Sequence, residues 1–361
     1  ILLKDLGKSK EAEISYSKAI EIKPDLAKAY YGLSLIRYSD ENKILQDQLF
    51  SENILINKSQ KDLIDIYFAR ANILHKEKNY RESAKYLKSA NNLKLDLHPS
   101  NSIGLINKSK ELLIESDKKE INQEEIKNSS EYIFIVGMPR SGSSLLESIL
   151  SMSNDVYDLG EIDILEESFL DCKKSKKDMN LADIYEEKVN SKTELNITTN
   201  KNLYNYQYAG IIAKQIPNAK IVHCFRNPLD NILSIYRTNF AKGNQYCRSL
   251  IDSANVYLDQ DEIMTEYKNR YRSKIYDLNY DLLVRDPNKE IKSLISWLGW
   301  EWSDSYLSPH LNPRSVSTAS SAEVRSPINS KSIGGWKNYK DMLQPAIKIL
   351  AKTERYKDIT S

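Results

Sequence analysis

The spacing of apolar residues changes along the chain and divides it into three parts. Residues 1–97 place apolar residues at helical spacing throughout, which predicts a stack of helices. In residues 98–130 the pattern weakens to one helical stretch at 103–114 and a charged segment rich in Asn and Ser, which predicts a helical linker. From residue 131 to 361 short apolar runs alternate with helical patterns, and we expect the domain boundary near residue 128. This alternation predicts an α/β domain.

Apolar runs in this third part predict buried strands. They are Tyr132–Val136, Val156–Leu159, Lys220–Phe225 and Ile275–Tyr280. A helical pattern follows each run, so the strands should lie parallel, with helices on both faces of the sheet. Residues 171–195 are rich in Lys and Glu and predict a solvated helix or loop. Residues 315–335 show no periodic pattern, and residues 336–350 return to a helical one.

A loop of small residues joins the first predicted strand to a helix. It runs from Gly137 to Ser144, and apolar residues then recur at helical spacing from Leu145. A strand, a small-residue loop and a helix N-terminus together direct backbone N–H groups toward a phosphate-like anion. The loop resembles an ATP-binding P-loop, but Ser143 stands where that motif requires Lys, and the cation is instead Arg140, inside the loop. The pattern therefore predicts an anion site and disfavours a P-loop kinase.

The helical part carries a repeat. Gly7, Ala12, Tyr16, Ala19 and Pro24 follow the small–small–aromatic–small–Pro spacing of a tetratricopeptide repeat. Ser83, Leu87 and Ala90 repeat the small–large–small triplet further along the chain, so residues 1–97 resemble tetratricopeptide-like helical repeats. A plain stack of helical hairpins is the alternative. Such stacks form concave binding surfaces, so we expect the repeats to recruit an acceptor protein or glycan.

Composition narrows the class of protein. Of 361 residues 40% are hydrophobic and 28% are charged, which is typical of a globular chain, and a formal net charge of +2 gives no electrostatic case for nucleic acid. Three cysteines without metal spacing predict reduced thiols, no metal site and a cytoplasmic location. No apolar run is long enough to predict a membrane segment. The chain starts at Ile1 within a helical pattern, so we expect it to be a fragment.

A second group of candidate anion-binding side chains is expected where the strand Lys220–Phe225 ends. Arg226 follows this strand directly, and Ser234 comes eight residues later on the next helix. Because ligands of parallel sheets gather at the carboxyl ends of strands, this guanidinium and hydroxyl suit a second phosphate group. Asp230 is expected to cap the helix, and His223, inside the strand, is expected to be a core histidine.

Five motifs in one order resemble the sulfotransferase superfamily. They are Gly137–Ser144, Gly160-Glu161, Asn200-Lys201, Arg226 with Ser234, and the segments Tyr280–Pro287 and Thr318–Pro327 that lead to Trp336. Within the superfamily the sequence is most similar to tyrosylprotein sulfotransferases and bacterial tetratricopeptide-repeat sulfotransferases. The resemblance covers about 220 residues and implies a P-loop-like parallel sheet, with 3′-phosphoadenosine-5′-phosphosulfate as the donor and no metal.

The resemblance also implies a role for each matching residue. Arg140, Lys201 and Glu161 would be catalytic, with Lys201 on the sulfuryl oxygens and Glu161 as the base that takes the acceptor proton. The donor would be bound by residues of three of these motifs. Those assigned to the 5′-phosphosulfate are Arg140, Ser141, Gly142, Ser143 and Ser144; those assigned to the 3′-phosphate are Arg226 and Ser234; Tyr280 and Ser320 would line the donor site.

Two departures from the family pattern bear on function. A basic residue usually precedes the Trp, but Gly334-Gly335 stand here, so Lys331 or Lys337 would have to substitute. The eukaryotic enzymes carry Arg two residues after the base, where this chain has Asp163, which weakens the case for an acidic acceptor peptide.

The resulting hypothesis is an enzyme that transfers sulfate to an acceptor hydroxyl, including protein tyrosine. The alternative is a repeat-based interaction protein whose second domain binds a nucleotide without catalysis. Intact Arg140, Lys201, Arg226 and Glu161 favour the enzyme, while the acceptor and the oligomeric state stay open.

Overall fold

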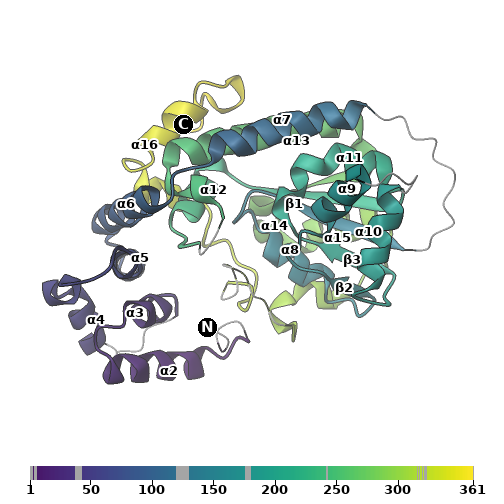
Figure 1. Ribbon diagram of the computed structural model, residues 1–361. Coiled ribbons are helices and arrows are strands. Elements are labelled where there is room, and N and C mark those ends of the chain that lie inside the picture. Colours follow the sequence, from purple (N-terminus) through teal and green to yellow (C-terminus); the bar gives the residue numbers. More distant parts are fainter. Residues whose placement is uncertain are drawn as a thin grey trace.

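The computed structural model describes residues 3, 6–36, 43–118, 130–174, 180–240, 243–314, 316, 318, 320 and 323–360. Helices α2 to α6 form its N-terminal part, as Figure 1 shows. Their bounds are α2 (Ser9–Ile22), α3 (Ala27–Ser34), α4 (Lys43–Phe50), the 3-10 turn η2 (Glu52–Leu55), α5 (Gln60–Lys76) and α6 (Tyr80–Leu97). α2 packs on α3, α3 packs on α5, and α5 packs on α6. Small residues allow close approach: a Cβ on Gly32 would lie 2.4 Å from the ring of Tyr16.

A five-stranded parallel sheet forms the centre of the second part. Its order is β2 (Val156–Asp158), β3 (Ile197–Asn200), β1 (Glu131–Gly137), β4 (Ala219–Phe225) and β5 (Ile275–Asn279). All four strand pairs are parallel, with Phe134 of β1 opposite Asn200 of β3 and Ile221 of β4. The carboxyl ends of all five strands therefore lie along the same edge of the sheet.

Helices cover both faces of this sheet, as the apolar runs require. Side chains of β1 alternate between the faces: Phe134 and Val136 pack under one layer, and Ile133 and Ile135 pack under the other. The first layer contains α9 (Ile164–Lys174), α10 (Leu181–Asn190), η3 (Leu203–Tyr208), α11 (Ala209–Gln215) and α13 (Leu250–Arg270), with η5 (Arg272–Lys274) nearby. The second contains α8 (Ser143–Leu150), α14 (Tyr280–Arg285), α15 (Pro287–Leu298), η6 (Asp304–Leu307) and η7 (Pro309–Leu311).

Helix α7 (Ser102–Asp117), in the stretch predicted as a linker, packs against the second part of the chain. It runs beside α13 (Figure 1), and its Leu112 is buried in the core that also holds Phe134. Ser109 Oγ lies 3.3 Å from the hydroxyl of Tyr206, and Gln207 Nε2 donates to the same Ser109 Oγ at 3.0 Å. α7 is thus held by both apolar and polar contacts.

A shared apolar core joins the repeats to the second part. Phe68 and Leu87, from α5 and α6, are fully buried in one cluster with Ile232 and Trp336. The elements that complete it are α12 (Pro228–Tyr236), η4 (Gln245–Arg248), η8 (Gly335–Tyr339) and α16 (Gln344–Leu350); η9 (Glu354–Tyr356) follows. Because this core contains residues of both parts, separating the repeats from the second part would expose apolar side chains of each to water and cost free energy.

The predicted fold class, a parallel sheet flanked by helices and preceded by helical repeats, is confirmed. Three local predictions were incomplete or wrong. β3 (Ile197–Asn200) was not predicted, because Thr198 and Thr199 interrupt an apolar pattern. Residues 181–190 are not a solvated face, since Tyr185 is fully buried against Phe134. The helix predicted at 336–350 is a 3-10 turn followed by α16.

Candidate functional site

Every predicted site motif except the C-terminal segment follows the carboxyl end of a strand. In sheet order these are Glu161 after β2, Lys201 after β3, the Gly137–Ser144 loop after β1, Arg226 after β4 and Tyr280 after β5. Because the five strands are parallel and adjacent, these motifs line one edge of the sheet, where ligands of such sheets bind. The sheet order, which the sequence does not reveal, is what brings these residues together.

The anion loop depends on two glycines in the positive-φ region. Gly137 has φ 141°, and a Cβ there would lie 2.2 Å from the carbonyl oxygen of Cys224 on β4. Gly142 has φ 98° and is the residue before α8; a Cβ there would lie 2.3 Å from the ring of Tyr280. An L side chain fits neither position. The first glycine therefore lets β1 and β4 pair up to the loop, and the second lets an aromatic ring close over it.

Arg140 leaves the loop toward the helix that carries Ser234. Its backbone is left-handed, with φ 67°, which is uncommon for a residue other than glycine. Its Nε donates to Ser234 Oγ at 3.1 Å, while the two Nη groups bond to Ser320 and to the exposed carboxylate of Glu323. The guanidinium thus joins three segments that are far apart in the sequence.

Arg226 is buried beside Tyr280 at the end of β4. Its guanidinium carbon lies 4.6 Å from the centre of the Tyr280 ring, and its Nη2 donates to the carbonyl oxygen of Ser332 at 2.9 Å. Asp281 is the nearby carboxylate, 3.8 Å from Nε, a distance too long for a hydrogen bond. The guanidinium keeps its direction because an aromatic face, a carbonyl and a carboxylate surround it.

The segment Asn329–Trp336, here called the C-terminal strap, crosses this end of the site. Asp230 holds it in place by accepting hydrogen bonds from the backbone N–H groups of Gly334 at 2.7 Å and Trp336 at 2.9 Å. The expectation that Asp230 caps its own helix is wrong, because Asn227 caps α12 and leaves the Asp230 carboxylate free to bind the strap. Burial raises the pKa of Asp230, and the two backbone donors oppose that rise.

Lys201 sits at the other end of the site between two carboxylates. Its side chain is fully buried, its Nζ lies 2.5 Å from Glu161 Oε1, and it lies 3.7 Å from Glu147 Oε2. Glu161 is exposed, with 54% of its side chain accessible, so it can reach an incoming molecule. The rival acid, Asp163, accepts from Asn202 Nδ2 at 2.6 Å instead. The predicted lysine and the predicted base are therefore in direct contact.

Two of the buried polar atoms at this edge that lack a hydrogen-bond partner among the described residues belong to the predicted donor-binding motifs. They are Ser141 Oγ and Arg226 Nε, which belong to the anion loop and to the end of β4. Buried polar atoms in native proteins almost always have partners, so an unpaired donor at a candidate site is a specific opening for a ligand. Ser144 Oγ, in contrast, lies 3.1 Å from Thr318 Oγ1.

Sequence reasoning missed Glu147, Asp281 and the strap. Glu147 had a recognisable signal, since it is the lone charge in the apolar helix that follows the anion loop. The strap contacts had none, because they are made by backbone groups of Ser332 and Gly334. Lys331 and Lys337, the expected substitutes for the missing basic residue, are both exposed, and Arg140 is the cation that contacts Ser234.

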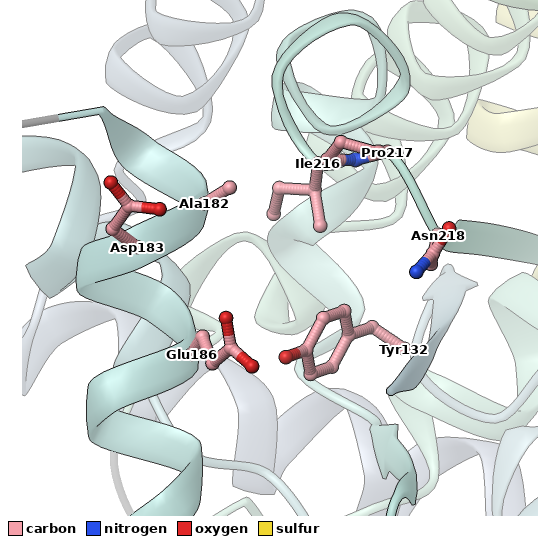
Figure 2. Close-up of a pocket in the computed structure, with 7 residues that line it drawn as sticks. All are labelled: Tyr132, Ala182, Asp183, Glu186, Ile216, Pro217 and Asn218. Carbon is pink, nitrogen blue, oxygen red and sulfur yellow. The ribbon is translucent and has the colours of Figure 1, made fainter. Parts of the chain in front are cut away.

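A small pocket elsewhere in the molecule is separate from this site. Figure 2 shows it between α10 and the amino ends of β1 and β4, with Tyr132, Glu186 and Pro217 among its lining residues. It therefore lies at the opposite edge of the sheet. Within the described ranges, no cluster of three or more His, Cys, Asp or Glu side chains is arranged to hold a metal, and no helix has the length and apolarity needed to span a bilayer.

Comparison with known proteins matches both parts of the chain to families. The model of the Sulfotransferase family matches residues 132–196 and 176–304, and the Tetratricopeptide repeat model matches residues 2–26 and 64–96. An uncharacterised protein of Aquifex aeolicus (strain VF5) is 30% identical over 242 residues, which are 60% of this chain; the chain spans about a third of that protein, 32% of its length. A Caenorhabditis briggsae protein named "Putative protein-tyrosine sulfotransferase" is 25% identical, over 58% of this chain and 82% of that protein.

Solved sulfotransferase structures also align with the chain, at low identity. The sulfotransferase domain of the Synechococcus PCC 7002 olefin synthase aligns with a TM-score of 0.47 and 18% identity, covering 64% of this chain and 98% of that domain. Mouse sulfotransferase SULT7A1, solved in complex with PAP, aligns with a TM-score of 0.41 and 19% identity, covering 70% of this chain and 92% of the mouse chain. The sequence matches carry the family assignment: residues 132–304 of this chain match the Sulfotransferase family model, and the tetratricopeptide-repeat matches precede them.

Proposed function

We propose that this chain transfers the sulfuryl group of 3′-phosphoadenosine-5′-phosphosulfate to an acceptor hydroxyl. The observation that supports it most is the placement of Lys201, Arg140 and Arg226 after three adjacent strands, with a small-residue anion loop between them. Sulfuryl transfer, like phosphoryl transfer, mainly needs fixed cations on the transferred group and on the leaving group. Three cations at one sheet edge meet that need, and the family match agrees with it.

The loop residues would bind the 5′-phosphosulfate. Ser143 and Ser144 open α8, where the first backbone N–H groups have no partner within the helix and the helix dipole favours an anion. The unpaired Ser141 Oγ fits this assignment, because a sulfate or phosphate oxygen would accept its hydrogen bond. Gly142 keeps the approach free of a side chain.

The 3′-phosphate would lie between Arg226 and Ser234. Arg226 has a buried Nε without a hydrogen bond among the described residues, and Ser234 is bonded to Arg140. Arg140 therefore links the two proposed binding regions, because it belongs to the loop assigned to the 5′-phosphosulfate and contacts the Ser234 hydroxyl assigned to the 3′-phosphate. Tyr280, stacked on the Arg226 guanidinium, and Ser320, bonded to Arg140, would line the same space.

Lys201 and Glu161 would carry the chemical step. The donor supplies an activated sulfuryl group, and the Lys201 ammonium would neutralise charge that develops on its oxygens. Glu161 would take the proton that the acceptor hydroxyl loses as its oxygen bonds to sulfur. A phenol has a pKa of about 10 and a free Glu about 4.3, so the proton should move late in the step, after the new bond has begun to form.

The acceptor proposed is a protein tyrosine, delivered by the repeats. The support is the name of the Caenorhabditis briggsae relative and the concave surfaces that tetratricopeptide repeats present to partners. A glycan or a small phenol would use the same site chemistry, because each offers a hydroxyl to Glu161.

Two measurements test the proposal. The first is thermal unfolding with 3′,5′-phosphoadenosine, AMP or ATP, where saturating ligand at 100 times its dissociation constant adds about 2.7 kcal/mol. The 3′-phosphorylated nucleotide should raise Tm well above the other two; equal shifts would contradict the 3′-phosphate assignment. The second is transfer of radiolabelled sulfate to peptide, glycan and phenol acceptors. Specific nucleotide binding without transfer to any acceptor would favour a non-catalytic interaction protein.

A further inference from the structure

Glu147 is a buried carboxylate with no role in the proposed chemistry so far. It lies on α8, one turn after the anion loop, among Leu146, Ile149 and Leu150. Only 11% of its side chain is accessible, and its Oε1 is buried with no hydrogen-bond partner among the residues described. Burying a carboxylate costs free energy unless a cation compensates for it. The cation here is Lys201, 3.7 Å from Oε2.

The two carboxylates around Lys201 differ in their freedom to move. Glu161 is exposed and can turn toward an acceptor, whereas Glu147 is buried on α8. A lysine ammonium has three N–H donors, so it can face both carboxylates and still direct one donor elsewhere. If Glu161 is to take a proton, its carboxylate has to turn toward the acceptor hydroxyl and away from the Lys201 ammonium, which lies 2.5 Å from its Oε1 in the resting site.

We propose that Glu147 is a positioning residue that holds the Lys201 ammonium toward the sulfuryl group while Glu161 leaves it to act as the base. This inference rests on the proposed function. Glu147 acts through Lys201 and does not touch the donor or the acceptor. The pair Glu147–Lys201 would remain through the step, and the pair Glu161–Lys201 would be specific to the resting site.

The charge of Glu147 should depend on pH in the neutral range. Burial raises its pKa to about 7, the like charges of Asp158 and Glu161 add to that rise, and Lys201 opposes it. Arg314 pairs with Asp158 at 3.2 Å and reduces that repulsion. As pH rises through 7, Glu147 gains its charge and holds Lys201 more firmly, so the transfer rate should rise with it.

The test compares Glu147→Gln with wild type and with Asp259→Asn as a matched control. Asp259 is also a buried carboxylate whose pKa burial raises, to about 6, but its partners are Ser109 and Tyr206 rather than Lys201. Single-turnover sulfate transfer is measured from pH 6 to 8 with saturating donor, on the acceptor that wild type uses. Binding of 3′,5′-phosphoadenosine is measured by calorimetry, and Tm checks that each variant folds.

We expect Glu147→Gln to lower the rate at pH 8 by about 10- to 100-fold, as misplacing one reacting group does, with little change in nucleotide affinity. The rise across pH 7 should disappear in this variant and persist in Asp259→Asn. A Glu147→Gln variant that keeps the wild-type rate and pH profile would overturn the proposal.

A second readout does not depend on activity. The ¹³C shift of Lys201 Cε, assigned with Lys201→Arg, should report the ionisation of Glu147 as a step near pH 7 that Glu147→Gln removes. If wild type shows no such step, Glu147 does not hold Lys201 and the inference fails. If the step is present but wild type transfers sulfate to no acceptor, the proposed function fails and the catalytic part of the inference fails with it.

Discussion

At the scale of single residues, the site consists of charged side chains held by specific neighbours. Arg140 bonds to Ser234 and Ser320, and Lys201 pairs with Glu161. Most of these charges are sheltered from water, and charge-assisted hydrogen bonds in such places are about twice as strong as neutral ones. Substitutions that remove one charge should therefore have large and separable effects on binding and on chemistry.

Arg140→Ala should weaken binding of the donor product. The variant removes the only cation of the anion loop together with its contact to Ser234, and losing a charged hydrogen bond costs about 1.5–3 kcal/mol. Calorimetric titration with 3′,5′-phosphoadenosine measures the loss. Arg272→Ala is the control, because Arg272 precedes β5 at the opposite edge of the sheet. Equal affinity of Arg140→Ala and wild type would refute the role of this arginine.

Glu161→Gln should lower the transfer rate and leave nucleotide affinity nearly unchanged. A positioned base contributes about 10²- to 10⁴-fold, and the amide keeps the shape of the side chain. The measurement is single-turnover sulfate transfer with saturating donor. Asp163→Asn is the matched control, since Asp163 is a neighbouring exposed acid bonded to Asn202. If Asp163→Asn is the slow variant instead, the base is Asp163.

At the scale of elements, backbone geometry decides which side chains meet. The left-handed residues at the end of β1 turn the chain sharply into α8, and Tyr280 of α14 closes over that turn. The C-terminal strap closes the other side, since the Tyr280 hydroxyl lies 3.0 Å from Ser332 Oγ. The anion loop, α14 and the C-terminal strap therefore contact one another. We expect a substitution that displaces one of them to displace the donor-binding residues as well.

Gly142→Ala should weaken nucleotide binding more than it weakens the fold. Gly142 (φ 98°) and Gly299 (φ 75°) both have a left-handed backbone, and an alanine forced into that conformation lowers the free energy of unfolding by about 1–2 kcal/mol. Only at Gly142 would the new Cβ also meet the Tyr280 ring, whereas none of the described atoms lies within 4 Å at Gly299. Gly299→Ala is thus the control for strain alone. Both variants should lose stability in thermal unfolding, and only Gly142→Ala should lose nucleotide affinity.

At the scale of the whole molecule, the repeats hold the helix that carries Ser234. Asn91 Nδ2 of α6 donates to the carbonyl oxygen of Tyr236 at 2.9 Å, where α12 ends. Lys94 Nζ lies 2.5 Å from Asn239 Oδ1, and Asn239 Nδ2 donates to Asp65 of α5 at 2.9 Å. Helices α5 and α6 are therefore a support of the site as well as a candidate surface for an acceptor.

Removing residues 1–99 should destabilise the rest of the chain. The deletion takes away Phe68 and Leu87, which are fully buried in the core that they share with residues of α12 and α16. Exposing apolar surface costs about 25 cal/mol per Å². A chain lacking only residues 1–58 keeps α5 and α6 and is the control. Tm and nucleotide affinity should fall far more in the chain that lacks residues 1–99 than in the chain that lacks only residues 1–58. A shorter chain that starts at residue 100 and binds like wild type would show that the repeats do not support the site.

The sequence by itself determined the main elements and most of the candidate site residues. The spacing of apolar residues and the composition of the segment are enough to predict a strand such as Tyr132–Val136, because a strand buried on both faces must be apolar throughout. They fail for β3, whose threonines are buried only because β1 and β2 lie on either side. They also fail for α10, where an apolar stripe hides among Lys and Glu.

Only the tertiary structure decided which side chains meet. The order β2-β3-β1-β4-β5 places Lys201 beside Glu161, and no local pattern encodes that order. The contacts of Arg140 with Ser320 and of Asp230 with Gly334 each join positions more than 100 residues apart in the sequence. Such contacts follow from the packing of whole layers, since the free energy that fixes them is the burial of apolar surface far from the site.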